Sequence, residues 1–388
     1  MHTATRRSTA LALALLLTTG AACSSDDRGG DAGPTTTNNT TEPTAPGLGL
    51  DEVQLLAAHN AYHLEGEEAL LAAITDNLPE LTPTIEYSHP TLTEQLDLGV
   101  RSMELDVFED PEGGRYAAPK AVELLGLEPI DPVMEEPGFK VFHIQEVDYR
   151  STCLTFVLCL EELEAWSTSH PRHLPIVIQI EAKDGEIADP LNLGFVQPIP
   201  TTEATFTALE AEILSVLDED QLVTVGDVQG SHDTARAAVE AEGWPDIDDL
   251  RGRFVFTLDD RSPKRDMYRA IHADTRDRLI FVSAEAPDDD AAFTVVNDPV
   301  IDGDRIRELV ALGYLVRTRS DADTAEARTG DTTRRDAAFA SGAQIISTDY
   351  EREDPRFPGF VVALPGQGGA ARCNPVSAPG CDASALEE

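Results

Sequence analysis

The sequence predicts an α/β fold, a TIM-type (β/α)8 barrel in a single domain, and three observations lead to it. Once 48 N-terminal residues are set aside, roughly 340 remain, which suits one barrel of this type with insertions. Short apolar runs rich in β-branched residues recur eight times, and helix-like stretches separate them. No internal repeat and no second domain boundary is evident. We therefore expect one domain over residues 49–365.

The eight apolar runs are the predicted barrel strands. In chain order they cover residues 55–58, 101–107, 140–144, 176–180, 254–258, 279–283, 314–318 and 344–347. Helix-like stretches lie between them, for example residues 159–169, 205–217 and 306–312. Residues 222–228 are a ninth candidate strand. We predict a loop there, because Gly226 and Asp227 interrupt the run and Gly230 follows closely.

The first 22 residues have the features of an export signal. Arg6 and Arg7 precede an apolar run over residues 9–17, and small residues follow this run up to Cys23. The apolar run is too short to span a bilayer as a helix. Residues 1–22 are therefore predicted to direct the chain out of the cytoplasm.

Cys23 stands directly after two alanines, and this arrangement resembles a bacterial lipoprotein signal. The resemblance implies that Cys23 is lipidated and anchors the chain to a membrane, although Gly20 replaces the usual leucine. Ordinary secretion is the alternative. Residues 23–48 are rich in Thr, Asn, Pro and Gly and are predicted to form a flexible tether. Under either interpretation the protein works outside the cytoplasm.

The chain is strongly acidic. Its 71 Asp and Glu residues outnumber its 29 Lys and Arg residues, so the formal net charge is −42. This balance argues against nucleic acid as a partner, because binding a phosphodiester backbone requires clusters of Lys and Arg. The hydrophobic fraction of 41% nevertheless predicts a folded chain rather than a disordered one. We expect a monomer.

Four further cysteines form two pairs that are close in sequence, Cys153 with Cys159 and Cys373 with Cys381. An even number of cysteines in an exported chain favours local disulfides. A zinc site is the alternative, but the chain has no CxxC motif and no histidine close in sequence to either pair. Residues 366–388 are predicted to be a C-terminal tail that carries the second disulfide.

Polar residues follow the predicted strands at the ends where barrel enzymes build their sites. These residues are His59, Asn60, Glu104, Asp106, His143, Glu181, Lys183, Arg317, Arg319, Asp349 and Tyr350. Each has a structural explanation when taken alone. A single histidine at a strand end is usually a structural residue with satisfied hydrogen bonds, and an Arg-x-Arg pair usually lies on the surface. Their coincidence at successive strand ends of one barrel predicts a functional site.

Four of these residues offer oxygen ligands for a metal ion. Glu104 and Asp106 are one residue apart, so their carboxylates project to the same side of a strand. Adjacent carboxylates repel unless a cation or a proton lies between them, although such a pair can also be a solvated strand face. Asn60 and Glu181 add two more oxygen donors, and an all-oxygen site favours Ca²⁺ or Mg²⁺ over zinc or copper. We prefer calcium, because its coordination is flexible and it is abundant outside cells.

Two histidines, His59 and His143, are expected to flank the metal. An ordinary pKa near 6.5 suits one as proton acceptor and the other as donor, each contributing about 10²- to 10⁴-fold in rate. A metal, two histidines and cationic side chains together predict chemistry on a phosphate. His63 either shapes the site or caps a helix. The remaining histidines after the tether are predicted to be structural or surface residues: His89, His170, His173, His232 and His272.

At this point the sequence resembles the calcium-dependent phosphatidylinositol-specific phospholipases C, and most closely their bacterial and fungal single-domain branch. The similar segments are residues 58–63, 99–107, 141–143, 178–184, 313–319 and 341–350, together with the Cys-bearing segment before Trp166. Their order and spread carry the resemblance, which covers roughly residues 52–382. It implies a TIM-barrel phosphodiesterase with one calcium ion.

The resemblance also implies a role for each matching residue. The calcium ligands are Asn60, Glu104, Asp106 and Glu181. The paired catalytic residues are His59 and His143. The residues that contact inositol or phosphate are Lys183, Arg317 and Arg319, with Tyr350 as a ring-stacking or hydroxyl contact.

The implied reaction is attack of the inositol 2-hydroxyl on the phosphorus of a phosphatidylinositol-type lipid, which releases diacylglycerol and a cyclic inositol phosphate. His143 is the expected general acid, and His59 either accepts the hydroxyl proton or stabilises the pentacoordinate phosphorus. The acidic surface opposes adsorption to anionic membranes, so glycosylated, monomeric or lysophospholipid substrates are alternatives. The chain shows no lipid-binding regulatory module of the kind that multidomain animal relatives carry.

Two other functions compete with this interpretation. A glycerophosphodiester phosphodiesterase shares the barrel, the metal and the paired histidines, but that family usually carries His-Arg-Gly where this chain has His59-Asn60-Ala61. A non-catalytic lipoprotein that binds calcium would be expected to lose a histidine or a metal carboxylate. None of the expected histidines or carboxylates is missing from the sequence, which favours an enzyme.

Overall fold

Eight parallel strands curve into a barrel in the computed structural model, which describes residues 47–189, 192–366 and 369–388. Neighbouring strands follow the order β6-β5-β4-β2-β1-β9-β8-β7. A parallel bridge between Ser283 and Phe293 joins the two ends of this order, where the amide of Ala284 donates to the carbonyl of Phe293 at 3.0 Å. The barrel is therefore nearly closed, which confirms the predicted fold class.

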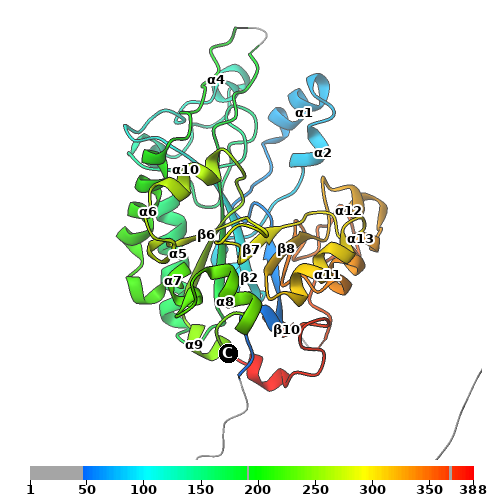
Figure 1. Cartoon of the computed structure of the whole chain (residues 1–388). Coiled ribbons are helices and arrows are strands. Elements are labelled where there is room, and N and C mark those ends of the chain that lie inside the picture. Colours follow the sequence, from blue (N-terminus) through cyan, green and yellow to red (C-terminus); the bar gives the residue numbers. More distant parts are fainter. Residues whose placement is uncertain (1–46, 190–191, 367–368) are drawn as a thin grey trace, which may run out of the picture. The chain divides into compact units, whose positions relative to one another are not determined.

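The elements alternate along the chain as expected for repeated β/α units. The strands are β1 (Val53–Ala58), β2 (Val100–Phe108), β3 (Lys140–Val141), β4 (Ile176–Ala182), β5 (Phe254–Leu258), β6 (Ile280–Val282), β7 (Phe293–Val295), β8 (Leu315–Arg319), β9 (Ile345–Thr348) and β10 (Ala371–Cys373). The α-helices are α1 (Glu68–Asn77), α2 (Thr82–Ile85), α3 (Leu92–Asp97), α4 (Lys120–Leu125), α5 (Phe156–Ser169), α6 (Glu203–Val216), α7 (Val225–Gln229), α8 (Ala235–Glu242), α9 (Ile247–Leu250), α10 (Lys264–Ala270), α11 (Gly303–Ala311), α12 (Ala325–Thr329) and α13 (Thr333–Ser341). The 3-10 helices are η1 (Leu50–Glu52), η2 (Pro132–Glu135), η3 (Glu219–Gln221), η4 (Thr275–Asp277) and η5 (Ala383–Leu386). In Figure 1, α1, α2 and α4 project from one end of the barrel, whereas β10 and the C-terminus lie at the other.

Seven of the eight predicted strands are barrel strands, and the prediction for residues 140–144 is wrong. Only Lys140 and Val141 form a strand, β3, and it runs antiparallel to the last residues of β2. The strand β2 is nine residues long, so its end extends far enough to pair with β3. The missing barrel strand is β7, which lies within the mostly apolar residues 291–296 that the prediction did not include. Residues 222–228 form no barrel strand, but the predicted loop is wrong for residues 225–228, which belong to the short helix α7.

The predicted helices over residues 159–169 and 205–217 begin a few residues earlier than expected, as α5 and α6. A threonine sets each start. The hydroxyl of Thr155 accepts from the amide of Leu158 at the beginning of α5, and Thr202 caps α6 in the same way. The third predicted helix, residues 306–312, corresponds to α11.

The two faces of each strand bury different residues. On β2, Met103 and Leu105 belong to the core between the barrel and the helices α5 and α6, so Glu104 and Asp106 face the barrel interior. Inside the barrel, an apolar layer near the strand beginnings contains residues such as Val177 on β4. Polar residues follow towards the carboxyl ends. The polar side chains inside the barrel are therefore concentrated at the carboxyl ends of the strands, where a polar site can form.

Both predicted disulfides are present, which confirms the pairings of Cys153 with Cys159 and of Cys373 with Cys381. The segment that carries the second one is packed on the barrel, because β10 pairs antiparallel with β1. The predicted signal peptide, Cys23 and nearly all of the predicted tether lie outside the described residues. Within the described part of the chain, no helix combines the length and the apolar character needed to cross a bilayer.

Candidate active site and metal centre

Three of the four predicted metal ligands meet at the carboxyl ends of β2 and β4. Oxygens of Glu104, Asp106 and Glu181 lie within 4.8 Å of one another. The strand register explains this convergence, because Asp106 stands directly opposite Glu181 in the parallel ladder. Glu104 precedes Asp106 on the same face of β2. The barrel therefore produces the carboxylate cluster that the Glu-x-Asp pattern predicted.

Asp106 is the member of this carboxylate cluster that most needs a cation. It is 1% exposed, its Oδ1 has no partner among the described residues, and its Oδ2 contacts only the ammonium of Lys183. Burial raises the pKa of Asp106 well above its ordinary value, and the neighbouring Glu181 and Glu104 raise it further against the opposing charge of Lys183. The ammonium of Lys183 lies 3.1 Å from Asp106 Oδ2 and 3.3 Å from Glu181 Oε1. An all-oxygen cluster with an unsatisfied buried carboxylate fits a hard divalent ion such as Ca²⁺.

Glu104 is held in its charged form by its neighbours. Arg317 donates from Nη2 to Glu104 Oε2 at 2.6 Å, and Gln179 donates to the other carboxylate oxygen at 3.2 Å. Burial alone would raise the pKa of Glu104, but Arg317 and His59 outweigh it and leave the pKa below its ordinary value. Arg317 also donates to Asn297 Oδ1 at 2.5 Å. The predicted phosphate ligand Arg317 is thus 2% exposed and bonded to protein atoms.

Asn60, the fourth predicted ligand, follows β1 in a left-handed backbone conformation with φ 48°. The adjoining amide of Ala61 donates to the carbonyl of Glu104 at 2.9 Å, which places Asn60 next to β2. Its side-chain nitrogen donates to the hydroxyl of Tyr87 at 3.1 Å. A left-handed conformation is costly for a residue other than glycine, and such positions cluster at functional sites. The contact with Tyr87 leaves the amide oxygen of Asn60 free to act as a ligand.

The ring of His59 is fixed by two partners from β8 and the end of β9. Its Nδ1 lies 2.7 Å from Asp349 Oδ1, and Arg319 Nη1 lies 3.3 Å from its Nε2. A guanidinium can only donate, so Nε2 carries the lone pair and the proton resides on Nδ1. Burial lowers the pKa of His59 and Arg319 lowers it further, while Asp349 acts in the opposite direction. His59 is therefore a neutral imidazole whose basic nitrogen lies 3.9 Å from Glu104 Oε2.

The ring of His143 has a carboxylate partner of its own, Asp148, at 2.7 Å from Nδ1. Nε2 of His63 faces the same carboxylate and lies 2.9 Å from both of its oxygens. Burial would raise the pKa of Asp148, but His63 and His143 lower it to about 2. His143 comes from the segment after β3 rather than from a barrel strand. Because β3 runs antiparallel to the end of β2, this segment still starts beside the strand that carries Glu104 and Asp106.

Several residues of this site had no clear signal in the sequence. Asp148 comes from the segment that follows β3, and Tyr87 lies between the rings of His63 and His59, with centroids 4.2 and 6.4 Å away. His63, which was expected either to shape the site or to cap a helix, contacts Asp148 and does not cap α1. His89, which was predicted to be structural or on the surface, is buried and supports the site. Its two ring nitrogens face Glu351 Oε2 at 2.9 Å and the carbonyl of His59 at 2.8 Å.

The structure does not bring the ring of Tyr350 to the carboxylate cluster. Tyr350 is 2% exposed, and its ring packs against those of Phe357 and Phe360 at 6.0 and 5.3 Å. Its neighbour Asp349 instead makes the contact with His59. The sequence pointed to the correct strand end, but the alternation of side chains turned Asp349 inwards and Tyr350 into the core.

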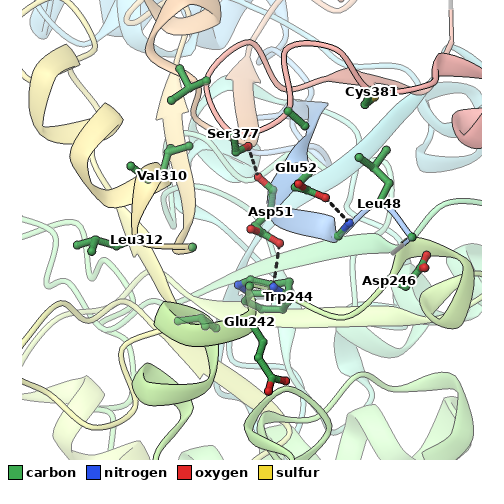
Figure 2. A pocket seen from close by; sticks show the side chains of 18 of the residues that line it. Leu48, Asp51, Glu52, Glu242, Trp244, Asp246, Val310, Leu312, Ser377 and Cys381 are labelled. Atoms are coloured by element: carbon green, nitrogen blue, oxygen red, sulfur yellow. Dashed lines mark hydrogen bonds between the residues drawn. The ribbon is translucent and has the colours of Figure 1, made fainter. Parts of the chain in front are cut away.

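A cavity of about 1000 Å³ lies at the other end of the barrel, where the strands begin (Figure 2). Its lining includes Asp51 and Glu52 before β1 and Gly313 before β8. Asp51 accepts from the amide of Trp244 at 2.8 Å, so this carboxylate is part of the packing there. Sites of barrel enzymes lie at the carboxyl ends of the strands. The cavity is therefore distinct from the carboxylate cluster.

Comparisons with known proteins agree with this geometry. The family model described as "Phosphoinositide phospholipase C, Ca2+-dependent" matches residues 48–375. No curated protein matches the chain. Among solved structures, the calcium-dependent phosphoinositol-specific phospholipase C of a Gram-negative bacterium, Pseudomonas sp., in its apo form is 16% identical with a TM-score of 0.52, over 86% of this chain and 97% of that one. The myoinositol complex of the Pseudomonas sp. enzyme is 15% identical, with the same TM-score and coverage.

The structural similarity, at this low identity, supports the barrel fold. The family match covers most of the chain, including the segments with Asn60, Glu104, Asp106, His143 and Glu181. This chain belongs to the calcium-dependent phosphoinositide phospholipase C family.

Proposed function

We propose that this protein is a calcium-dependent phospholipase C that cleaves phosphatidylinositol-type lipids to diacylglycerol and a cyclic inositol phosphate. The observation that carries the proposal is the meeting of three carboxylates, Glu104, Asp106 and Glu181, next to a histidine that is held as a neutral base. Membership of the family supports the same reaction.

The metal ligands are proposed to be Asn60, Glu104, Asp106 and Glu181. One Ca²⁺ bound by them would supply Lewis-acid assistance, which is worth on the order of several kcal/mol in lowering the pKa of a hydroxyl and neutralising charge at phosphorus. The chain prepares for this ion in two ways. Arg317 and Gln179 fix the carboxylate of Glu104, and Tyr87 fixes the amide of Asn60.

We assign His59 as the general base that takes the proton from the inositol 2-hydroxyl. Its Nε2 carries the lone pair, and its Nδ1–H donates to Asp349, which stabilises the imidazolium that forms on proton transfer. Arg319 donates to the same Asp349 at 3.1 Å from its Nη2 and keeps this carboxylate charged. Burial would raise the pKa of Asp349, but His59 and Arg319 lower it well below the ordinary value.

We assign His143 as the general acid that protonates the leaving oxygen of diacylglycerol. Its Nδ1 is bonded to the buried Asp148, so Nε2 is the nitrogen available to a substrate. The side chain of His143 is 20% exposed, whereas that of Asp148 is fully buried. The buried carboxylate orients the ring so that Nε2 faces the side from which a substrate can approach, as a general acid requires.

The cationic residues divide into two groups. Lys183 and Arg319 are proposed to contact the phosphate or the inositol, because their side chains are 20% and 14% exposed at the carboxyl ends of the strands. Arg317 is proposed to act through Glu104, since it is buried and fully engaged. Tyr350 is proposed to hold the β9 end by packing rather than to stack on the substrate.

Exposed apolar residues in segments that follow barrel strands support a lipid substrate. Leu124 in α4 is 58% exposed, and Val300 and Ile301, in the segment between β7 and α11, are 54% and 79% exposed. Both segments follow the carboxyl end of a strand, as the carboxylate cluster does, and Figure 1 shows α4 projecting from the barrel. Exposed apolar side chains at the end of the barrel that holds a polar site suit a substrate that has acyl chains and a charged head group.

We propose that the chain is exported, in agreement with two disulfides that require an oxidising compartment. We also propose that Cys23 is lipidated and that the protein is a monomer. Labelling with a radioactive fatty acid in a bacterial host, compared between the natural chain and Cys23→Ala, tests the anchor. Loss of the label in the variant would support lipidation, and an unlabelled natural chain would contradict it.

The reaction is tested by measuring hydrolysis of phosphatidylinositol with Ca²⁺, with a chelator, and with Mg²⁺ added after chelation. We expect activity with Ca²⁺, loss on chelation, and no recovery with Mg²⁺. Analysis of the products formed from glycerophosphoinositol separates the two enzyme families. A phospholipase C releases glycerol and a cyclic inositol phosphate from it, whereas a glycerophosphodiesterase releases glycerol 3-phosphate and inositol. Activity that resists chelation would reject the proposed role of the metal.

The role of His143 is tested with His143→Ala, and His170→Ala is the matched control on the protein surface. The first variant should lose turnover by about 10²- to 10⁴-fold and retain Ca²⁺ binding, while the control should keep both. Unchanged hydrolysis by His143→Ala would rule out its assignment as general acid.

A further inference from the structure

A second group of metal-ligating atoms lies beside the carboxylate cluster and differs from it in chemistry. One ligand atom from each of His63, His143 and Asp148 lies within 4.8 Å of the others, and the carboxylate of Asp148 faces His63 Nε2 at 2.9 Å and His143 Nδ1 at 2.7 Å. The two imidazole rings meet edge to face with centroids 6.0 Å apart, and the carboxylate lies between their nitrogens. This group contains two nitrogens and one oxygen, whereas the cluster of Glu104, Asp106 and Glu181 contains oxygens alone.

The tautomer of His63 makes it a suitable ligand. Its Nδ1 lies 3.1 Å from the backbone carbonyl of Tyr87, which can only accept, so Nδ1 carries a proton. In a neutral ring the lone pair of Nε2 then points at the carboxylate of Asp148, only 2.9 Å away. Two lone pairs at this distance require a proton or a cation between them. Metal-bound histidines typically donate their other N–H to a carbonyl in this way.

We propose that His63, His143 and Asp148 form a second metal site that takes Zn²⁺ or a similar transition-metal ion and is separate from the calcium site. Imidazole nitrogens favour zinc over calcium, and a carboxylate completes a three-ligand set of the kind found in open zinc sites. Zinc–ligand distances are about 2.0–2.2 Å, so the three atoms need to separate by only about 0.5 Å to surround the ion.

The surroundings determine how an ion enters and what its remaining ligand is. The side chains of His63 and Asp148 are fully buried, but that of His143 is 20% exposed. An ion therefore enters past the ring of His143, and water on that side supplies the fourth ligand. Zn²⁺ would bind between the two rings and Asp148, outside the all-oxygen cluster, so it does not compete with Ca²⁺.

Zinc binding has a consequence for turnover that, unlike the site itself, rests on the proposed function. When Zn²⁺ is bound to Nδ1 of His143, this nitrogen can no longer donate a hydrogen bond to Asp148. His143 then loses its capacity as general acid. Zn²⁺ is thus expected to inhibit phosphatidylinositol hydrolysis when Ca²⁺ is saturating. Binding is measured without substrate, so a chain that lacks the proposed activity still tests the site, and a chain that lacks the site still tests the activity.

The test is calorimetric titration of the calcium-saturated protein with Zn²⁺ alone, with the visible spectrum of bound Co²⁺ as a second measurement. We expect one Zn²⁺ per chain, and affinity that falls at least about 100-fold in His63→Gln and in Asp148→Asn. His232→Gln is the control, because this histidine faces Glu242 on the surface at 3.2 Å, away from the strand ends. This variant should bind Zn²⁺ as the natural chain does.

Two outcomes would overturn the proposal: no Zn²⁺ binding by the calcium-saturated natural chain, or equal binding by the natural chain and both site variants. Circular dichroism of each variant establishes that it is folded. If His63→Gln and Asp148→Asn do not fold, His143→Ala removes a ligand with a partly exposed ring and decides the question by the same titration. A Co²⁺ spectrum that Ca²⁺ abolishes would also contradict the proposal, since it would place both ions in one site.

Discussion

Arg317 and Glu104 form a buried ion pair at 2.6 Å inside the barrel, with side chains that are 3% and 6% exposed. Glu104 belongs to the carboxylate cluster, so this pair places a fixed positive charge behind a proposed calcium ligand. The arginine keeps the carboxylate charged and oriented whether or not an ion is present. It thereby explains how acidic groups can gather in a buried site without preventing folding.

The first prediction concerns this ion pair. Arg317→Met leaves the carboxylate of Glu104 buried without its partner, and we expect a loss of about 3–5 kcal/mol in the free energy of unfolding. Urea denaturation in the presence of a chelator measures this loss, and added Ca²⁺ should restore part of it. Arg305→Met is the control, because Arg305 pairs with Glu285 on the surface, where a loss below about 1 kcal/mol is expected. Equal losses in the two variants would contradict the role given to Arg317.

The second prediction concerns Asp349 as the partner of His59. Asp349→Asn removes the charge that stabilises a protonated His59, so kcat should fall by about 10²- to 10⁴-fold. The affinity for Ca²⁺, measured by calorimetry, should stay the same because Asp349 is not a proposed ligand. Asp354→Asn, further along the same segment, should leave kcat unchanged. A fall in Ca²⁺ affinity that matches the fall in kcat would show that Asp349 has a structural role instead.

The third prediction concerns the pH dependence of stability through Asp51, at the opposite end of the barrel (Figure 2). Burial raises the pKa of Asp51 to about 6, partly against the hydrogen bond from the amide of Trp244. A raised pKa in the folded state means that the contribution of Asp51 to stability is complete below its unfolded pKa. This contribution is lost as the pH rises through about 6.

Asp51→Asn keeps an acceptor for the amide of Trp244 and removes the buried charge. The variant should match the natural chain near pH 4 and become more stable as the pH rises, by no more than about 3 kcal/mol above pH 7. Urea denaturation across this pH range measures the difference. Glu242→Gln is the control in the same cavity lining, with an expected difference near zero because this side chain is 76% exposed. A destabilised Asp51→Asn at neutral pH would refute the prediction.

The fourth prediction concerns the net charge of −42. Repulsion among so many carboxylates destabilises the compact state, and salt screens it over about 10 Å at 0.1 M. The midpoint of thermal unfolding should therefore rise with NaCl, by about 2–4 °C for each kcal/mol gained. Measurement in a chelator separates this effect from calcium binding. A midpoint that falls with salt would mean that surface ion pairs outweigh the repulsion.

Local sequence patterns were sufficient for the parts of this protein that depend on neighbouring residues. The alternation along residues 102–107 placed Glu104 and Asp106 on one face of a strand, because side chains alternate along any strand. The short spacings of the cysteines identified both disulfides, since nearby cysteines in an exported chain pair with each other. The number of apolar runs indicated the barrel, although it counted β3 as a barrel strand and missed β7.

Only the tertiary structure determined which distant residues meet. The sequence placed His59 and Arg319 at a site, but not the contact of His59 with Asp349, 290 positions away. It predicted that Arg317 contacts phosphate, whereas the parallel register turns this side chain towards Glu104. Pairing across strands depends on register and on how each loop returns to the barrel. Neither register nor loop path is encoded in a short segment. The sequence alone therefore determined the barrel and the types of ligand residue, whereas the packing of distant strands determined which residues contact each of them.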